Sequence, residues 1–335
     1  MTYICYPKGL IRPDTNKKQD IMYKITCTAL VLCAALLFSW GCKGHNTAAE
    51  KQTAAVMDST RTFEYIKVPD SLTSPQARAE YVTEHFWDNY DFADTTLLKL
   101  PQVSEQGFAD YISILNSVEP DMGRKSIGLF LEKASAVPAA RDYFLSLAEK
   151  YLYDPNSPAR NEELYICAVE SYLADKRVPE MSRLRPEAQL ETLLKNREGT
   201  PAADFKYEAI GGAKGSLYGI KTPYTLVYFN NPECENCHIT TSRMKNSPTL
   251  NEMIRDKQLT ILSIYPDGQV EMWREHAADF PSNWVVAYDK GRTIDAGRLY
   301  DLRAIPSLYL LDKDKKVLMK DADLWHAEAY LSKAQ

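Results

Sequence analysis

Residues Tyr224–His238, YTLVYFNNPECENCH, are the most informative stretch of this sequence. They begin with an apolar, β-prone segment, Thr225–Phe229, pass through a turn-forming Asn-Asn-Pro, and reach two cysteines, Cys234 and Cys237. A strand followed by a turn and a pair of cysteines three positions apart, at the start of a helix, is typical of a thiol redox site. The stretch therefore predicts a dithiol that attacks or forms disulfide bonds.

The composition of the 335 residues is that of a globular protein, because 45% are hydrophobic and 25% are charged. The length suffices for two domains of ordinary size. A net charge of −5 argues against nucleic acid as a partner, and the sequence has neither a glycine-rich phosphate-binding loop nor a long basic run.

The seven cysteines do not form a disulfide framework, because only Cys234 and Cys237 lie as a pair in sequence that we expect to fold. Four others lie within the first 42 residues. Cys167 lies among apolar residues, and we interpret it as a small buried hydrophobic side chain. No second Cys-x-x-Cys and no histidine pair follows the first pair, so we predict no metal site.

Residues 1–42 predict an export segment. Ile25–Trp40 is apolar but shorter than the roughly 20 residues of a transmembrane helix, which fits a signal peptide. A conventional signal peptide starts at Met22, so we expect translation to begin there. Leu37–Cys42 resembles a bacterial lipobox, and we expect Cys42 to carry a lipid that anchors the protein to a membrane. An ordinary cleaved signal peptide or a single-span anchor is the alternative.

Two domains follow the export segment. Residues 43–70 are polar and predict a tether. Residues 71–198 predict an all-α domain of six helices, because apolar residues recur at three- and four-residue steps and prolines separate the segments. The first helix should start at Pro75 after an N-cap at Thr73-Ser74, and the sixth should start at Pro186.

Residues 199–335 predict an α/β domain in which strands alternate with helices around one sheet. We expect a leading hairpin and a closing antiparallel hairpin at its edge. The expected strands are Phe205–Ile210, Ser216–Ile220, Tyr224–Phe229, Leu259–Tyr265, Trp284–Tyr288, Ser307–Leu311 and Val317–Lys320. The expected helices are His238–Ile254 with a step at Pro248, Val270–Ala277, Ile294–Leu302 and a last one from Asp323.

The helical domain contains no catalytic constellation that the sequence reveals. His85 lies on an apolar helix face, and we predict a core residue there rather than a ligand. We expect the run that starts at Trp87, WDNYDFAD, to be a helix end that packs on its neighbours.

With these elements in place, residues Pro201–Ser332 resemble the thioredoxin fold of the membrane-tethered, extracytoplasmic thiol-disulfide oxidoreductases. The resemblance rests on PAADF at Pro201–Phe205, the junction of strand and Cys-x-x-Cys, Ile305-Pro306 just before a strand, and LYLLD at Leu308–Asp312. In that family the proline is cis and faces the dithiol, which implies that Ile305 and Pro306 form the substrate groove. Residues 71–198 resemble an uncharacterised helical domain of bacterial envelope lipoproteins.

The expected roles of the two cysteines differ. Cys234 lies at a helix N-terminus, where free N–H groups and the helix dipole stabilise a thiolate, and Cys237 is the resolving thiol. The carboxylates of Glu233 and Glu235 flank Cys234 and should oppose its ionisation. We therefore predict a reductant rather than an oxidant. Tyr228 occupies the position where thioredoxins commonly keep a buried acid, which leaves Glu233 or Glu235 as candidate proton acceptors.

The resemblance implies thiol–disulfide exchange on disulfide-containing envelope proteins, without a bound cofactor. Electrons would come from a membrane thiol reductase, and the protein would be lipid-anchored in the cell envelope, facing the periplasm. One alternative is a non-catalytic adaptor with a thioredoxin fold. Another is c-type haem attachment, because Cys234-x-x-Cys237-His238 matches its pattern. Haem attachment normally occurs in helical, loop-rich domains rather than at the end of a buried strand.

Overall fold

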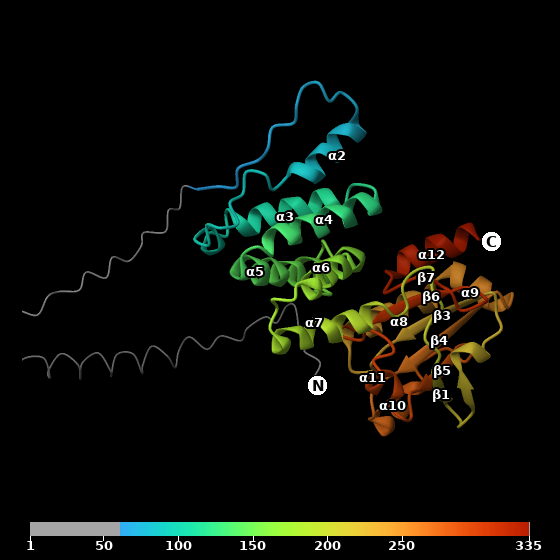
Figure 1. The fold of residues 1–335 in the computed structure, drawn as a ribbon. Helices are drawn as coiled ribbons and strands as arrows, with labels where there is room; N and C mark the ends of the chain where they lie inside the picture. The colour runs from blue at the N-terminus through green and yellow to red at the C-terminus, as the bar shows by residue number, and fades with distance from the viewer. Residues whose placement is uncertain (1–60, 335) are drawn as a thin grey trace, which may run out of the picture. The chain divides into compact units, whose positions relative to one another are not determined.

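A computed structural model describes residues 61–334 as a helical region followed by an α/β domain (Figure 1). This confirms the two-part fold class expected from the sequence. The predicted export segment with Met22 and Cys42, and residues 43–60 of the predicted tether, lie outside the described residues. Within residues 61–334, no helix combines the length and the apolar composition needed to cross a membrane.

The helical region starts its helices where local chemistry favours a start. Its elements are α2 (Pro75–His85), η1 (Leu97–Lys99), α3 (Ser104–Leu115), α4 (Pro120–Ala134), α5 (Pro138–Ala148), η2 (Glu149–Tyr153), α6 (Glu162–Ala174) and α7 (Glu180–Leu193). Proline is the first residue of α2, α4 and α5, where its missing N–H has no helical partner to lose. Ser74 caps α2 by accepting a hydrogen bond from the Ala77 amide, as predicted.

Two local predictions for this region were wrong. Helix α7 begins at Glu180 and contains Pro186 in its interior, a position where a proline more often ends or kinks a helix. His85 is not a core residue: its side chain is 41% exposed, and its Nδ1 lies 2.6 Å from Oδ2 of Asp88. Trp87 is buried, as expected, and stacks on Phe130 with ring centroids 4.5 Å apart.

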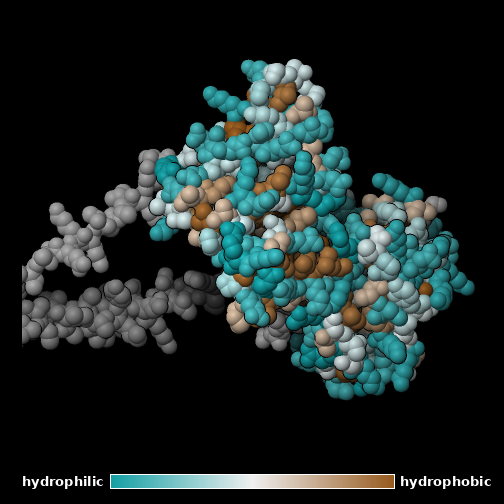
Figure 2. Space-filling view, in the orientation of Figure 1, coloured by the Kyte–Doolittle hydropathy of each residue, from teal (hydrophilic) through white to brown (hydrophobic). Residues whose placement is uncertain are grey.

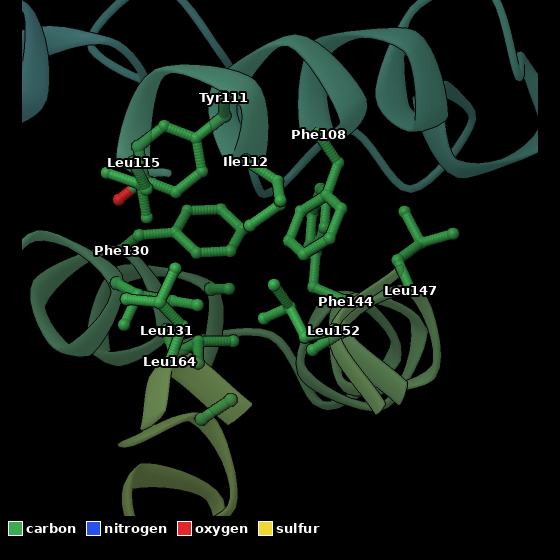
Figure 3. Close-up of a cluster of buried hydrophobic side chains, with 14 of the residues drawn as sticks. Phe108, Tyr111, Ile112, Leu115, Phe130, Leu131, Phe144, Leu147, Leu152 and Leu164 are labelled. Carbon is green, nitrogen blue, oxygen red and sulfur yellow. The ribbon is translucent and has the colours of Figure 1, made fainter. Parts of the chain in front are cut away.

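Aromatic and aliphatic side chains from α3, α4, α5 and α6 form the core of the helical region (Figure 3). Residues of α3 point toward those of the other helices; the side chains labelled in the figure are Phe108, Tyr111, Ile112, Leu115, Phe130, Leu131, Phe144, Leu147, Leu152 and Leu164. Hydrophilic residues cover most of the face seen in Figure 2. Apolar burial is therefore the main source of stability here.

The last ten residues of the predicted tether do not form a free linker. Residues 61–70 contain no helix or strand, but Phe63 is buried and stacks on Phe86 with ring centroids 5.1 Å apart. The Phe63 ring lies directly over Gly107 of α3, where a Cβ would overlap it. The packed part of the chain therefore starts before residue 71.

The α/β domain has a seven-stranded sheet in the order β2-β1-β5-β4-β3-β6-β7. Its strands are β1 (Lys206–Ala209), β2 (Lys214–Ser216), β3 (Tyr224–Phe229), β4 (Leu259–Tyr265), β5 (Val285–Tyr288), β6 (Ser307–Leu311) and β7 (Val317–Met319). Strands β3, β4 and β5 are parallel, and β1, β6 and β7 add antiparallel pairs. The further elements are η3 (Leu217–Gly219), α8 (Glu235–Asn246), α9 (Pro248–Arg255), α10 (Val270–Ala277), α11 (Thr293–Ala296) and α12 (Leu324–Lys333).

Strand β3 is buried on both faces of the sheet, and its side chains alternate between two cores. Leu226 and Tyr228 belong to one core, whereas Val227 and Phe229 belong to the other. A continuous apolar run is what a central parallel strand requires. The strand predicted at Tyr224–Phe229 is thereby confirmed.

The expected helix Ile294–Leu302 was largely wrong. Helix α11 ends at Ala296, and residues 297–306 form neither helix nor strand. The backbone oxygen of Leu299 accepts a hydrogen bond from the Asn196 side chain, so tertiary contacts replace helical ones. The second strand of the leading hairpin also differs from the expected Ser216–Ile220, because β2 ends at Ser216, whose side chain caps η3.

Candidate active site

The sheet places the two cysteines at the carboxyl end of β3. Residues 230–233 connect the strand to α8, and Cys234 is the N-cap residue of that helix. The side chain of Asn231 accepts a hydrogen bond from the Glu233 amide at 2.8 Å, and its backbone oxygen accepts one from the Cys234 amide at 3.0 Å. The connection is pinned to β4 by a 2.8 Å hydrogen bond from Asn230 to Ser263. Cys234 therefore has a fixed position at the start of a helix.

The environment of the pair favours different protonation states for its two sulfurs. Both cysteines are buried, and both are free thiols. A hydrogen bond from the Cys237 thiol, helped by the backbone N–H groups of Cys237 and Asn236, outweighs burial and lowers the pKa of Cys234 to about 6. The same hydrogen bond, together with burial, raises the pKa of Cys237 well above its usual value. Near neutral pH, Cys234 is the thiolate and Cys237 keeps its proton.

The charges of Glu233 and Glu235 are not among the largest influences on the pKa of Cys234. We expected their charges to oppose ionisation, but the pKa of Cys234 is lowered. Both glutamates are exposed, so solvent screens their charges, whereas the hydrogen bonds act directly on the sulfur. The sequence shows which charges are neighbours, but not which N–H and S–H groups point at the sulfur.

Tyr228 lies under Cys237 as a hydrogen-bond donor. Its hydroxyl donates to the backbone oxygen of Cys237 at 2.8 Å and lies 3.0 Å from Oγ1 of Thr241. Burial raises the pKa of Tyr228 far above its usual value, so the hydroxyl stays protonated. A hydrogen bond from Tyr228 lowers the pKa of Cys237, against the larger effects of Cys234 and burial. Tyr228 therefore cannot replace the buried acid as a proton acceptor.

Ile305 and Pro306 lie beside the dithiol, as the resemblance implied. The peptide bond between them is cis. Sheet register places Ser307, the next residue, opposite Phe229 at the end of β3. The Sγ atom of Cys234 lies 3.6 Å from the backbone oxygen of Ile305. Residues 71 positions apart therefore meet at one surface of the site.

A cavity of about 140 Å³ lies beside the resolving cysteine. Its lining is mostly polar and includes Asn231, Cys237, His238, His276 and Asp279. Among residues 61–334, no group of three or more His, Cys, Asp or Glu side chains is arranged to hold a metal ion.

Asp267 is a candidate proton acceptor that we missed in the sequence. It follows β4, and its carboxylate accepts a 3.3 Å hydrogen bond from the side chain of Asn231. Burial raises the pKa of Asp267. The backbone N–H of Asn231 in turn donates to the Cys237 sulfur and lowers its pKa. The sequence offered one signal for Asp267: an acidic residue just after β4, which is parallel to β3. Parallel strands end at the same edge of a sheet, so this residue lies near the end of β3.

Comparisons with known proteins agree with this geometry. A domain of unknown function, DUF5106, matches residues 41–196, and a thioredoxin-like family matches residues 223–317. The solved structure of a thioredoxin-like protein from Bacteroides caccae is 42% identical, covers 82% of this chain and 99% of its own, and superposes with a TM-score of 0.79. The chain belongs to the thioredoxin-like family. The thioredoxin-like fold that the sequence resembles is thereby confirmed.

Other solved structures match part of this thioredoxin-like chain. The C-terminal domain of an uncharacterised protein from Bacteroides fragilis is 47% identical over 41% of this chain and 98% of its own, with a TM-score of 0.40. The thioredoxin domain of a thiol-disulfide oxidoreductase from Bacteroides vulgatus is 24% identical over 41% of this chain and 97% of its own, with a TM-score of 0.37. No curated protein matches the chain.

Proposed function

We propose that this thioredoxin-like protein is a thiol-disulfide oxidoreductase that uses Cys234 and Cys237. The observation that carries the proposal is the geometry of the buried pair: Cys234 is the N-cap residue of α8, 3.6 Å from the backbone oxygen of Ile305 in the cis Ile305-Pro306 unit. In this setting the pKa of Cys234 is lowered to about 6, whereas that of Cys237 is raised. A thiolate is the form of cysteine that attacks a disulfide. Cys234 is therefore the nucleophile at neutral pH, and Cys237 is the resolving thiol beside it.

The exchange takes place in two balanced steps. The Cys234 thiolate attacks one sulfur of a substrate disulfide, so that a mixed disulfide forms, the substrate S–S bond breaks, and one substrate sulfur leaves as a thiolate that takes up a proton. Cys237 then loses its proton and attacks Sγ of Cys234, which releases the second substrate sulfur. The substrate gains two electrons and two protons, and the enzyme ends as the Cys234–Cys237 disulfide.

The substrate side of the proposal rests on the surface beside Cys234. The half-buried Ile305-Pro306 unit beside Cys234 would lie along an extended substrate segment, and Pro306 has no N–H of its own to donate there. We propose disulfide-containing proteins of the cell envelope as substrates and a membrane thiol reductase as the electron donor. We also propose that a lipid on Cys42 anchors the protein to a membrane of the cell envelope, with the thioredoxin-like domain facing the periplasm.

We further propose that the protein is a reductant. The pKa of about 6 at Cys234 is closer to the value of about 7 in thioredoxin than to the value of about 3.5 in the strong periplasmic oxidant. A strongly stabilised thiolate makes a dithiol oxidising, because it stabilises the reduced form.

Trapping the mixed disulfide tests the proposed activity. The reduced Cys237→Ser variant is mixed with a peptide that contains one internal disulfide, and the products are weighed by intact mass spectrometry. We expect a stable adduct of one peptide on Cys234, no adduct on Cys234→Ser, and fully reduced peptide with the unaltered protein. Absence of an adduct on Cys237→Ser would favour the non-catalytic adaptor instead.

A further inference from the structure

The segment that contacts Cys234 is held by residues of the helical region. We call residues 297–307, between α11 and the start of β6, the groove segment. Residues 297–306 have no regular secondary structure, so ordering them costs conformational entropy that helix or sheet hydrogen bonds do not offset. The position of the Ile305 oxygen, 3.6 Å from Sγ of Cys234, therefore depends on tertiary contacts.

Arg303 forms the first of these contacts, two residues before Ile305. Its guanidinium carbon lies 3.2 Å from the centre of the Tyr153 ring, and its Nη1 donates to the Tyr153 backbone oxygen at 3.1 Å. Asp301 holds the same guanidinium through Nε at 2.8 Å and Nη2 at 2.7 Å. Tyr153 is buried and stacks on Tyr165 of α6, with ring centroids 4.6 Å apart.

Tyr153 is placed by an irregular end of helix α5. It is the last residue of η2, a π-helical segment that directly follows α5. Such segments are rare and are often found at functional sites, because they redirect side chains that an α-helix would point elsewhere. The neighbouring residues 154–161 then turn the chain into α6. Tyr153 is thus available to Arg303 at the edge of the helical region.

A second contact lies two residues after Ile305. The hydroxyl of Ser307 donates to Oδ1 of Asp321 at 2.8 Å, and the other oxygen of Asp321 accepts from Arg160. Arg160 also donates to Glu162 at 2.6 Å, and Glu162 pairs with Lys320 at 2.8 Å. The four charged side chains are between 10% and 22% exposed, so solvent screens the network only in part.

A third contact holds the start of the groove segment. The Asn196 side chain donates to the backbone oxygen of Leu299 at 2.6 Å. The ammonium group of Lys195 lies within hydrogen-bond distance of the backbone oxygens of Gly297, at 3.2 Å, and Arg298, at 3.1 Å. Both donors follow α7 directly. Side chains of the helical region therefore satisfy three successive carbonyl groups of the segment.

We propose that the helical region, through Tyr153 and Arg160 above all, is a brace that positions Ile305-Pro306 against Cys234. This inference rests on the proposed exchange activity and assigns a task to a domain of unknown function. The contacts lie on both sides of Ile305, at Arg303 and at Ser307, so they fix the position of Ile305 as well as joining the two domains. Tyr153 and Arg160 are positioning residues, because they act on the groove through Arg303 and Asp321.

The test removes two contacts of the brace separately, the one between Arg303 and Tyr153 and the one between Arg160 and Asp321. Arg303→Met and Arg160→Met keep the apolar stems of the side chains and lose the guanidinium groups. Arg197→Met is the matched control, because Arg197 pairs with Glu163 and makes no contact with the groove segment. Each change is made in the Cys237→Ser background, and the rate of mixed-disulfide formation with the peptide disulfide is measured as peptide concentration rises.

We expect the half-saturating peptide concentration to rise about tenfold in Arg303→Met and Arg160→Met, with the saturated rate nearly unchanged. Misplaced groove contacts weaken binding, whereas the sulfur chemistry is untouched. Arg197→Met should behave like its parent. Hydrogen exchange at residues 299–305 should speed up in the first two variants and stay constant in the control. Unchanged half-saturation and unchanged exchange in both brace variants would overturn the proposal.

Two further outcomes keep the test informative. If the parent protein forms no mixed disulfide, the proposed activity fails, but hydrogen exchange still decides whether the helical region holds the groove segment. If Arg303→Met does not fold, Arg303→Lys takes its place, because lysine keeps the charge but cannot stack flat on Tyr153 or bind Asp301 with two nitrogens. We expect Arg303→Lys to raise the half-saturating concentration less than the methionine variant does.

Discussion

The hydroxyl of Tyr228 lies 2.8 Å from the backbone oxygen of Cys237, directly beneath the resolving thiol. The resemblance led us to compare this position with the buried acid of thioredoxins. Here the position holds a neutral donor whose pKa is raised by burial, so it cannot accept the proton of Cys237. It can instead stabilise the negative charge that forms when Cys237 attacks.

Tyr228→Phe should slow the resolving step and lower stability by about 1 kcal/mol, the usual net value of a hydrogen bond. The hydroxyl lowers the pKa of Cys237, so its loss should raise that pKa and move the pH profile of resolution to higher pH. The rate at which a preformed mixed disulfide releases its peptide checks this. Thr241→Val, which loses only the neighbouring hydroxyl, is the control. An unshifted profile in Tyr228→Phe would contradict the role.

Alkylation of Cys234 should follow a titration with its midpoint near pH 6. Only the thiolate reacts, so the rate rises as pH increases through the pKa and levels off above it. Cys237→Ala removes the thiol that donates to Cys234, and the midpoint should move upward. Rates of iodoacetamide labelling between pH 4 and 10 measure both values. A midpoint at or above about 8.5, the value of a free cysteine, would contradict the described environment.

The double substitution Glu233→Gln and Glu235→Gln should change the alkylation midpoint of Cys234 by less than about half a pH unit. Both carboxylates are exposed, and screening by solvent and salt weakens their effect on the sulfur. The same labelling experiment, at low and at physiological salt, checks this. A fall of a full pH unit in the alkylation midpoint of Cys234 would show that the two carboxylates oppose its ionisation, as the sequence suggested.

Two glycine substitutions should change stability in opposite directions. Gly107→Ala should destabilise the protein, because the new Cβ overlaps the Phe63 ring and forces it out of its buried position. Gly128→Ala lies in α4 with open space around the new methyl group, and it should stabilise by up to about 1 kcal/mol. Urea unfolding measures both. Equal effects would show that residues 61–70 do not pack as described.

Much of the α/β domain could be predicted from the sequence because its strands are apolar runs of definite length. Tyr224–Phe229, Leu259–Tyr265 and Ser307–Leu311 are strands with the predicted limits, since turn-forming residues bound each run. The cis Ile305-Pro306 bond could be expected from the resemblance alone. Helix starts in the helical region were predictable where a cap and a proline coincide, as at Pro75.

The remaining features depend on contacts between residues far apart in the sequence. The apolar pattern of Ile294–Leu302 predicts a helix, but the helix ends at Ala296, and Lys195 and Asn196 bind the carbonyl groups of residues 297–299 in another conformation. The pKa of Cys234 depends on which N–H and S–H groups point at its sulfur, which a sequence does not show. Tertiary geometry decides both, and local pattern does not.

An equilibrium redox titration of the Cys234–Cys237 pair in glutathione or dithiothreitol buffers, read by mass after alkylation, tests directly whether the pair is a reducing dithiol. We predict one two-electron transition at a potential closer to about −270 mV, as in thioredoxin, than to about −120 mV, as in the strong periplasmic oxidant. Cys167→Ser should give the same curve, because Cys167 lies apart from the pair, in the helical region. A potential near about −120 mV would contradict the reductant, and the absence of any two-electron transition would contradict the redox dithiol itself.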